Sequence, residues 1–358
     1  MSDALAVVVG IDRYPDALLG PLAGAINDAE AFCAWLKTPD GGGLTETTTA
    51  DTTEIHKVLS IDDGSGAIDA RPTTAEVERA LEHVRESAEA RLAASAENGA
   101  PPPYRRLYLY FAGHGIGPDV EQAALLMANA GQGRFGHYVQ GRRYANYFRA
   151  RASFDEVILF MDCCRDRYPY VAAPALRWDP DPPEPARDVE PAFLFAFATK
   201  WSKKSREGVV GGQPRGFFSA ALLEGLKGSA ANAAGNVTAQ TLDSYVNARL
   251  PRIVNGGKVE DPDFMYKPLD PLVLIKYGAA ASRHFTKVRV TLSVAHQAPS
   301  AVSVVQDNQP VALADEVRVR PDLWTFRLPF GVYSLQNVAT RQSAPFQVLG
   351  PEDVDVTF

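Results

Sequence analysis

Residues 107–115 read LYLYFAGHG, and residues 157–165 read VILFMDCCR. Each stretch is a continuous apolar run followed by a reactive side chain, His114 in the first and Cys164 in the second. Continuous apolar runs of this kind predict strands that are buried on both faces of a sheet. If the two strands are neighbours in a parallel sheet, both reactive side chains emerge at the same edge.

Strand-like and helix-like segments alternate over the first three quarters of the chain. The predicted strands are 4–11, 107–111, 157–161, 193–199 and a last one at 272–275, and the predicted helices are 23–36, 73–92, 144–149, 217–226 and 241–250. This alternation predicts an α/β fold with a mostly parallel sheet flanked by helices. Functional residues of such sheets lie at the carboxyl ends of the strands. Those ends are residues 10–12, 112–115 and 162–165.

The character of the sequence changes after Lys276, and the run of small residues at 278–282, GAAAS, resembles a linker. Apolar and polar residues then alternate in short segments, as in Val288–Val294. Alternation with a period of two is typical of strands with one buried face. We therefore expect an α/β domain at 1–278 and a small C-terminal all-β sandwich domain at 284–358.

The composition is that of a globular protein, with 46% apolar residues, 22% charged residues and a formal net charge of −7. No long Lys/Arg run is present, which argues against nucleic acid as a partner. No segment approaches the roughly 18 apolar residues of a membrane span. The first residues include Asp3, where a secretion signal would be basic. We expect a cytoplasmic protein without nucleic-acid or membrane partners.

The chain contains three cysteines: Cys33, Cys163 and Cys164. Their odd, low number indicates free thiols in a reducing compartment, and neither a disulfide framework nor a Cys-based metal site is expected. A cysteine reacts as its thiolate, which needs a base or a positive field nearby. His114, flanked by two glycines that permit close approach, is the candidate base for Cys164.

The two motifs resemble those of caspases and metacaspases. Residues 110–115 (YFAGHG) resemble the family's His motif, and residues 162–165 (DCCR) resemble its Cys motif at a spacing known from caspases. Three further segments match in the same order, at 8–14, 22–29 and 216–223. The resemblance covers about residues 4–277 and points to the bacterial metacaspase and orthocaspase group of clan CD.

This resemblance implies a caspase-like fold and a thiol protease that cleaves within protein chains. Cys164 is then the nucleophile and His114 the general acid and base, while Cys163 stands where relatives carry Ser or Ala. The backbone N–H groups of Gly115 and Cys164 are expected to form the oxyanion hole. The sequence shows no obvious third group that would orient His114.

The resemblance also implies the substrate class. Asp28 and Asp162 match the two carboxylates of the metacaspase specificity pocket, which favour a cationic side chain. We therefore expect protein substrates that are cleaved after Arg, with Lys second. Ala25 and Ala112 replace the Cys and Ser common in that pocket, and Asp166 replaces a Gly or Ser, so the shape of the pocket stays open.

Residues 165–191 contain seven prolines and no clear period. A long loop inside a compact domain is usually functional, and relatives are often cut at this place during maturation. We expect a zymogen that is cut here by itself, by an activating protease or with a regulatory partner. The candidate sites are Arg165, Arg167, Arg177 and Arg187, with Arg177 and Arg187 preferred.

No cofactor is expected from the sequence. Some relatives depend on calcium held by an acidic loop, but no convincing set of ligands is recognisable, so calcium dependence stays open. Two other functions also stay open. One is a catalytically silent caspase-like binding module that acts through its β domain, and the other is a cysteine hydrolase of related fold that cleaves a different bond.

Overall fold

The computed structural model describes residues 3–47, 53–95, 104–118, 123–167, 184–232, 234–254, 260–267, 272–277, 286–297, 302–306, 309–311, 313–337, 339–348 and 353–358. The chain divides into two compact units. The first comprises Met1–Leu223 and Ile253–Leu272, and the second comprises Glu224–Arg252 and Val273–Phe358. The domain boundary expected between residues 278 and 284 falls outside the described residues and stays a prediction.

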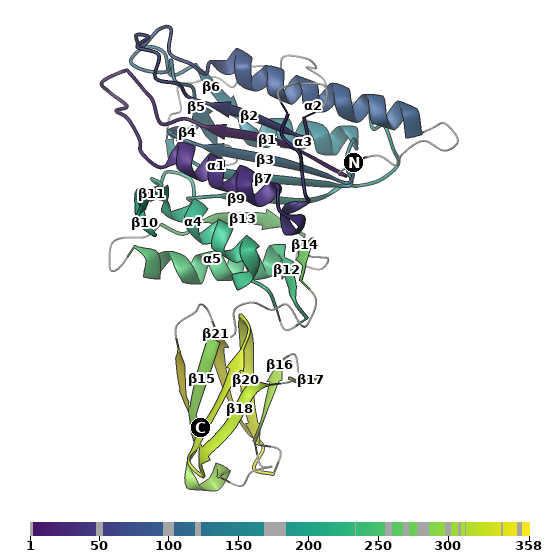
Figure 1. Ribbon diagram of the computed structural model, residues 1–358, viewed down its shortest axis with the longest axis vertical. Coiled ribbons are helices and arrows are strands. Elements are labelled where there is room, and N and C mark those ends of the chain that lie inside the picture. Colours follow the sequence, from purple (N-terminus) through teal and green to yellow (C-terminus); the bar gives the residue numbers. More distant parts are fainter. Residues whose placement is uncertain are drawn as a thin grey trace. The chain divides into compact units, whose positions relative to one another are not determined.

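The first unit is built on a six-stranded sheet in the order β13-β9-β7-β3-β1-β2 (Figure 1). These strands are β1 (Ala4–Gly10), β2 (Ile55–Leu59), β3 (Arg106–Ala112), β7 (Glu156–Asp162), β9 (Ala192–Phe197) and β13 (Asp263–Tyr266). All are parallel except β13, which runs antiparallel to β9. The mostly parallel sheet predicted from the alternating pattern is confirmed.

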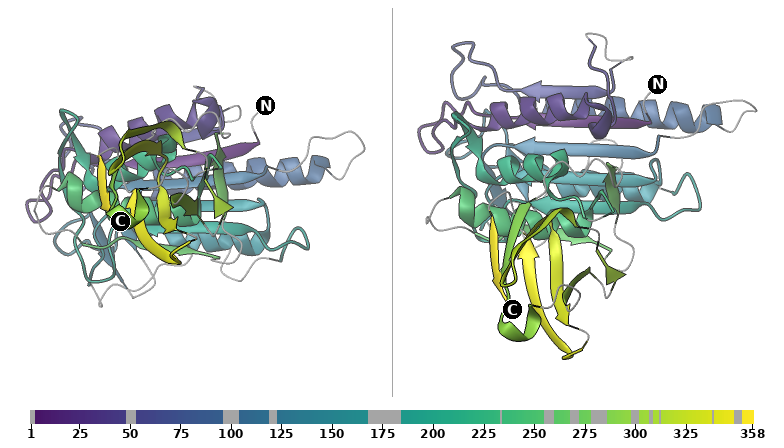
Figure 2. Two further views of the ribbon diagram at one scale, coloured as in Figure 1. Left: turned by 90° about the horizontal axis from the view of Figure 1, so that it is seen from below. Right: turned by 60° about the horizontal axis from the view of Figure 1, so that its bottom comes forward.

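Helices cover both faces of this sheet, which is why its central strands are apolar throughout. Every residue of β1, β3 and β7 is buried. One face packs against α2 (Thr74–Ser95) and α3 (Gly141–Arg151), whose buried side chains share one core with alternate residues of the strands. On the other face, Phe32 of α1 (Ala25–Leu36) stacks on Tyr110 with 4.6 Å between ring centroids. Figure 2 shows the same strands side by side from two other directions.

A second, smaller sheet joins the loops that follow β3 and β7. It has the order β6-β5-β4-β8, formed by β4 (Gly115–Gly117), β5 (Ala124–Leu126), β6 (Tyr138–Gln140) and β8 (Asp166–Arg167). The pairing of β4 with β8 is parallel and places Ile116 opposite Asp166. Strands of two or three residues are too short to show a period, so the sequence pattern did not predict them.

A hairpin and a helix complete the first unit beside the sheet. The hairpin consists of β10 (Glu207–Val210) and β11 (Gln213–Gly216), and it leads directly into α4 (Phe217–Glu224). In the second unit, α5 (Ala239–Ile253) follows β12 (Asn236–Thr238), which pairs with β14 (Val273–Lys276). The last strand expected at 272–275 therefore exists as β14, but its partner is β12, and β13 is the strand that closes the edge of the central sheet.

The C-terminal part of the second unit is a β-sandwich, as expected from its period-two pattern. Its two four-stranded sheets have the orders β18-β19-β15-β22 and β17-β16-β20-β21. In β15 (Thr286–Thr291), buried and exposed residues alternate strictly. The buried residues of both sheets form one core around Trp324 and Phe326. The remaining strands are β16 (Val302–Gln306), β17 (Gln309–Pro310), β18 (Ala314–Arg320), β19 (Leu323–Leu328), β20 (Gly331–Asn337), β21 (Gln342–Val348) and β22 (Val354–Thr357).

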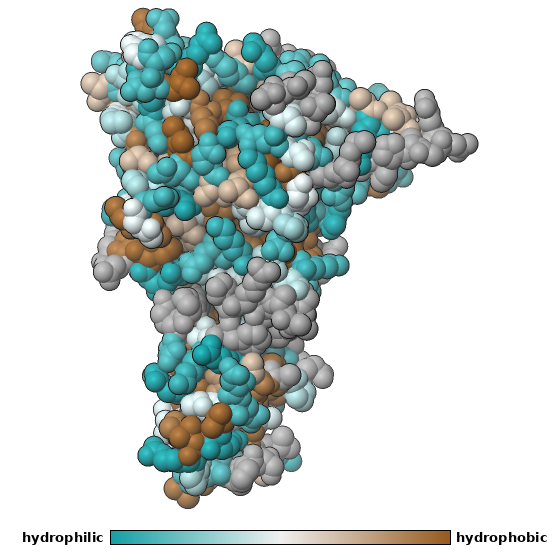
Figure 3. Space-filling model, in the orientation of Figure 1, coloured by the Kyte–Doolittle hydropathy of each residue, from teal (hydrophilic) through white to brown (hydrophobic). Residues whose placement is uncertain are grey.

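On the face drawn in Figure 3, hydrophobic residues are scattered among hydrophilic ones over both units. None of the helices in the described ranges is both long and apolar enough to cross a membrane.

Candidate active site

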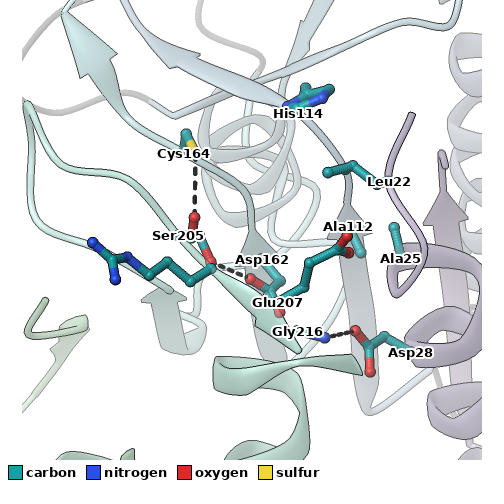
Figure 4. Close-up of a pocket in the computed structure, with 12 residues that line it drawn as sticks. Leu22, Ala25, Asp28, Ala112, His114, Asp162, Cys164, Ser205, Glu207 and Gly216 are labelled. Carbon is teal, nitrogen blue, oxygen red and sulfur yellow. Dashed lines mark hydrogen bonds between the residues drawn. The ribbon is translucent and has the colours of Figure 1, made fainter. Parts of the chain in front are cut away.

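The register of two neighbouring strands brings His114 and Cys164 to the same edge of the sheet. β3 and β7 pair in parallel, with Ala112 directly opposite Asp162. Each reactive residue follows two positions after its member of that pair, so the two side chains leave the sheet at equivalent places. Both line one small pocket of about 80 Å³, which Figure 4 shows in close-up.

Two contacts fix the position of His114. Its backbone N–H donates to the hydroxyl of Tyr14 at 2.9 Å, and that hydroxyl donates to the carbonyl of Leu126 at 3.1 Å. Its side-chain Nε2 lies 3.1 Å from the carbonyl oxygen of Gly20. The carbonyl of Gly20 is therefore the third group that orients the imidazole. No residue in the sequence marks this contact, because a backbone carbonyl can come from any residue type.

This contact also determines the tautomer of the imidazole. A carbonyl oxygen can only accept a hydrogen bond, so Nε2 must carry the proton that points at Gly20. Nδ1 of the neutral ring then keeps its lone pair. Burial lowers the pKa of His114 below its usual range, more strongly than the Gly20 contact raises it. At neutral pH the ring is thus neutral, and Nδ1 can act as a base.

Two glycines allow the loops after β3 and β7 to meet. Gly113 has φ +153°, and a Cβ there would lie 2.5 Å from the Tyr14 hydroxyl. A Cβ on Gly115 would lie 2.6 Å from the carbonyl oxygen of Cys164 and 2.7 Å from Sγ of Cys163. Only glycine fits at these two positions. Because Gly115 has no side chain, its backbone can lie in contact with that of Cys164.

Cys164 is half-buried, and its thiol donates to the carbonyl oxygen of Ser205 at 3.7 Å. Among the residues with described placement, no hydrogen bond joins this thiol to His114. Burial raises the pKa of Cys164 to about 11, so the resting thiol is protonated at neutral pH. Cys163 is almost completely buried, and burial likewise raises its pKa far above the usual range. It is a packed thiol.

The floor of the pocket is acidic. Asp28, on α1, and Asp162, at the end of β7, are both buried and both line the pocket below Cys164 (Figure 4). The structure therefore brings together the two carboxylates that the sequence assigned to substrate binding. A Cβ on Gly216 would lie 2.2 Å from Oδ2 of Asp162 and 3.0 Å from Oδ2 of Asp28, so only glycine fits between them.

Donors within the protein occupy both carboxylates, and in the described part of the chain only Asp28 has a cationic partner. Asp28 accepts from the backbone N–H of Gly216 at 2.6 Å and from the guanidinium of Arg215. Asp162 accepts from the hydroxyls of Ser205 at 2.8 Å and Ser219 at 2.7 Å. Burial, with the charge of Asp162 as the second cause, still raises the pKa of Asp28 to about 7. Burial raises the pKa of Asp162 as well.

Three further polar residues of the pocket, Ser205, Arg206 and Glu207, were missed by the sequence analysis. Glu207, the first residue of β10, adds a third carboxylate, which accepts from the backbone N–H groups of Ala23 and Gly24 at 3.0 and 2.9 Å. Ser205 contributes its carbonyl to the thiol and its hydroxyl to Asp162. No signal in the sequence marks them, since a single Ser or Glu in a polar hairpin is usually a solvated residue.

Comparison with known proteins places this geometry in a family. A model of the peptidase C14 caspase domain matches residues 3–303. The chain belongs to this caspase-domain family. The chain is also 27% identical over 245 residues to a protein from a Desulfuromonadales bacterium that is named a probable protease. That match covers 63% of this chain and 26% of the relative, so the chain spans about a quarter of the relative's length.

Solved caspase structures are also similar to the chain. The crystal structure of caspase-1 from Spodoptera frugiperda has a TM-score of 0.46 and 14% identity, and covers 76% of this chain and 90% of that one. A structure of pro-sf-caspase-1 has a TM-score of 0.43 and 15% identity, over 75% of this chain and 93% of that one.

The arginines of the Pro-rich segment of this caspase domain have different surroundings. Arg165 is 1% exposed and pairs with Asp263 at 2.7 Å, so it is a buried structural residue in the folded chain. Arg187 pairs with Asp155 at 2.7 Å and donates to the carbonyl of Ala152 at 2.9 Å. Arg167 ends β8, and Arg177 lies outside the described residues.

The structure also shows where the three residues that depart from the metacaspase motifs lie. Ala25 and Ala112 both line the pocket, where their small side chains leave room beside the carboxylates. Asp166 lies outside the pocket lining and forms an ion pair with Lys204 at 3.4 Å. Within the described ranges, no group of three or more His, Cys, Asp or Glu side chains could hold a metal ion.

The raised pKa of the thiol predicts how free Cys164 reacts with iodoacetamide. Because only the thiolate reacts and the pKa of Cys164 is about 11, the alkylation rate should rise about tenfold per pH unit from pH 7 to 9. Mass spectrometry of the labelled peptide measures this rate, and Cys164→Ala corrects for the other two thiols. A rate that is already constant above about pH 7 would instead indicate a preformed thiolate–imidazolium pair.

Proposed function

We propose that this caspase domain is a cysteine endopeptidase that cleaves protein chains after Arg, with Lys second. One observation carries the proposal: three carboxylates, from Asp28, Asp162 and Glu207, line one pocket together with His114 and Cys164. Membership of the caspase-domain family supports the thiol chemistry, and the acidity of the pocket supports the choice of a cationic side chain.

The arrangement of the polar groups favours Arg over Lys. The planar guanidinium has five N–H donors and can contact two carboxylates at once, whereas an ammonium group acts as a compact point charge. Oδ2 of Asp28 and Oδ2 of Asp162 both lie close to Gly216, and Glu207 lies on the hairpin that borders the pocket. A guanidinium reaching between them would replace the Ser205 hydroxyl as a donor to Asp162.

The chemistry follows from the groups around the thiol. When the Cys164 thiol leaves the Ser205 carbonyl, Nδ1 of His114 takes its proton, and the sulfur attacks the carbonyl carbon of the substrate. The backbone N–H groups of Gly115 and Cys164 stabilise the oxyanion. His114 then gives the proton to the leaving amine as the C–N bond breaks. Water hydrolyses the remaining thioester and releases the acid and the free thiol.

Resting Cys164 is protonated and hydrogen-bonded away from His114, so substrate binding must bring thiol and imidazole together. Hydrogen bonds in a catalytic site are often long or absent before substrate binds. The contacts of Ser205 supply a physical route. Its hydroxyl is bound to Asp162 and its carbonyl accepts the thiol, so a cation that displaces the hydroxyl also loosens the carbonyl from Cys164.

A panel of fluorogenic peptides tests the specificity. We expect kcat/KM to be highest with Arg before the scissile bond, lower with Lys and negligible with Asp. Cys164→Ala should abolish cleavage, and Glu207→Gln should lower kcat/KM for Arg roughly tenfold, because one charged partner is lost. Glu86→Gln, on the exposed face of α2, is the matched control and should match wild type. Preferred cleavage after Asp would refute the proposal.

The pKa of about 7 for Asp28 predicts that substrate binding depends on pH. A pKa raised above its ordinary value means that Asp28 is mainly neutral at pH 6 and mainly charged at pH 8. The ionised fraction rises from about a tenth to about nine tenths, so KM for an Arg peptide should fall several-fold over this range. Asp28→Asn should have a high KM with little pH dependence. An equal fall in both proteins would exclude Asp28 as the titrating group.

We further propose that the chain is made as a zymogen and is cut in the segment after Cys164. Arg165 is too buried to be a site in the folded chain, and cleavage after Arg187 requires the loss of its two contacts. Intact mass of the wild type after incubation, with and without calcium, should show fragments that begin after Arg177 or Arg187. Cys164→Ala should stay intact. A wild type that keeps its full-length mass throughout the incubation, as Cys164→Ala does, would show that self-cleavage does not occur.

A further inference from the structure

A second pocket, of about 550 Å³, lies beside the acidic pocket, on the loops that follow β1 and β2. Its aliphatic walls are formed by Pro15, Ala17, Pro21, Leu22, Ile26 and Ile61. Ile61 is 51% exposed, so its side chain is not used by the core of the first unit. The volume is within the range that ligand-binding pockets commonly have.

The charged residues of this pocket already have partners within the protein. Arg13 pairs with Asp62 at 2.9 Å and donates to the carbonyl of Ser65 at 2.7 Å. Asp16 pairs with Arg134 at 3.2 Å, and Asp12 accepts from the backbone N–H of Ile26 at 3.1 Å. Because these charged groups already hold partners within the protein, the surface left for a ligand is mainly aliphatic.

The second pocket adjoins the active site. Leu22 lines both pockets, and Gly20, which lines the second, holds Nε2 of His114 through its carbonyl. The imidazole therefore lies at the border between the acidic pocket and the aliphatic one. A peptide that passes the imidazole from the acidic pocket enters the aliphatic pocket next.

The order of the strands fixes which part of a substrate that would be. Along the sheet edge, Cys164 follows β7, His114 follows β3, and the second pocket follows β1 and β2. During cleavage, Cys164 attacks the carbonyl carbon and His114 protonates the amine nitrogen. The direction from Cys164 to His114 is thus the direction from the acyl half of the substrate to its leaving half.

We propose that the second pocket binds the first residues after the scissile bond and selects aliphatic or aromatic side chains there. This inference rests on the proposed peptidase function and extends it. It assigns a second specificity site to the loops after β1 and β2, separate from the acidic pocket that selects the residue before the bond.

Internally quenched peptides with Arg before the bond test the assignment, with Leu, Gly, Lys or Asp at the two positions after it. We expect wild type to cleave the Leu peptide roughly tenfold faster in kcat/KM than the Gly peptide, as burial of a Leu side chain allows. Ile61→Asp should lower that Leu-to-Gly ratio about fivefold or more. It should also favour Lys over Asp after the bond, a gain that misfolding cannot produce.

Ile68→Asp provides the matched control, since Ile68 is 70% exposed and does not line the pocket. Its Leu-to-Gly ratio should equal that of wild type. An Arg-aminocoumarin substrate has no residue after the bond, so its cleavage depends on the peptidase activity and not on the second pocket. The second pocket is not this subsite if the aminocoumarin substrate is cleaved but Ile61→Asp leaves the Leu-to-Gly ratio of kcat/KM unchanged. The same conclusion follows if Ile61→Asp and Ile68→Asp change that ratio equally. If no Arg substrate is cleaved, the peptidase proposal itself fails.

Discussion

The in-register pairing of β3 with β7 is the constraint on which the rest of the site depends. Because Ala112 lies opposite Asp162, the residues that follow them, His114 and Cys164, leave the sheet together. A shift by one residue would turn the reactive side chains to opposite faces. The short ladder between β4 and β8 then keeps the two loops in contact beyond the sheet, at a distance that only Gly115 permits.

Burial is the common cause of the unusual protonation states at this edge. It raises the pKa of Cys164 and of Asp28, and it lowers the pKa of His114. Each group is therefore less charged at rest than it would be in water. The resting site holds a neutral thiol, a neutral imidazole and a partly protonated acidic floor. A cationic substrate would stabilise the charged forms of these carboxylates, so its binding would be coupled to their ionisation.

The parallel sheet also places the two pockets and the reactive pair on loops along one edge. The hairpin after β9 and the start of α1 supply the acidic pocket, the loops after β7 and β3 supply thiol and imidazole, and the loops after β1 and β2 supply aliphatic walls. A peptide that runs from the acidic pocket past Cys164 and His114 would reach the aliphatic walls last. Each loop can vary without disturbing the buried strands, because the sheet and its helices carry the stability.

The sequence by itself determined the buried strands, the flanking helices, the C-terminal sandwich and the pair His114 and Cys164, because hydrophobic period and local motifs are properties of neighbouring residues. The tertiary structure alone decided that Gly20 orients the imidazole and that Glu207 joins the acidic pocket. It also decided that β13, and not the last predicted strand, closes the sheet. These features depend on contacts between residues far apart in the chain. The type of a residue does not reveal which distant group its backbone carbonyl or polar side chain will contact.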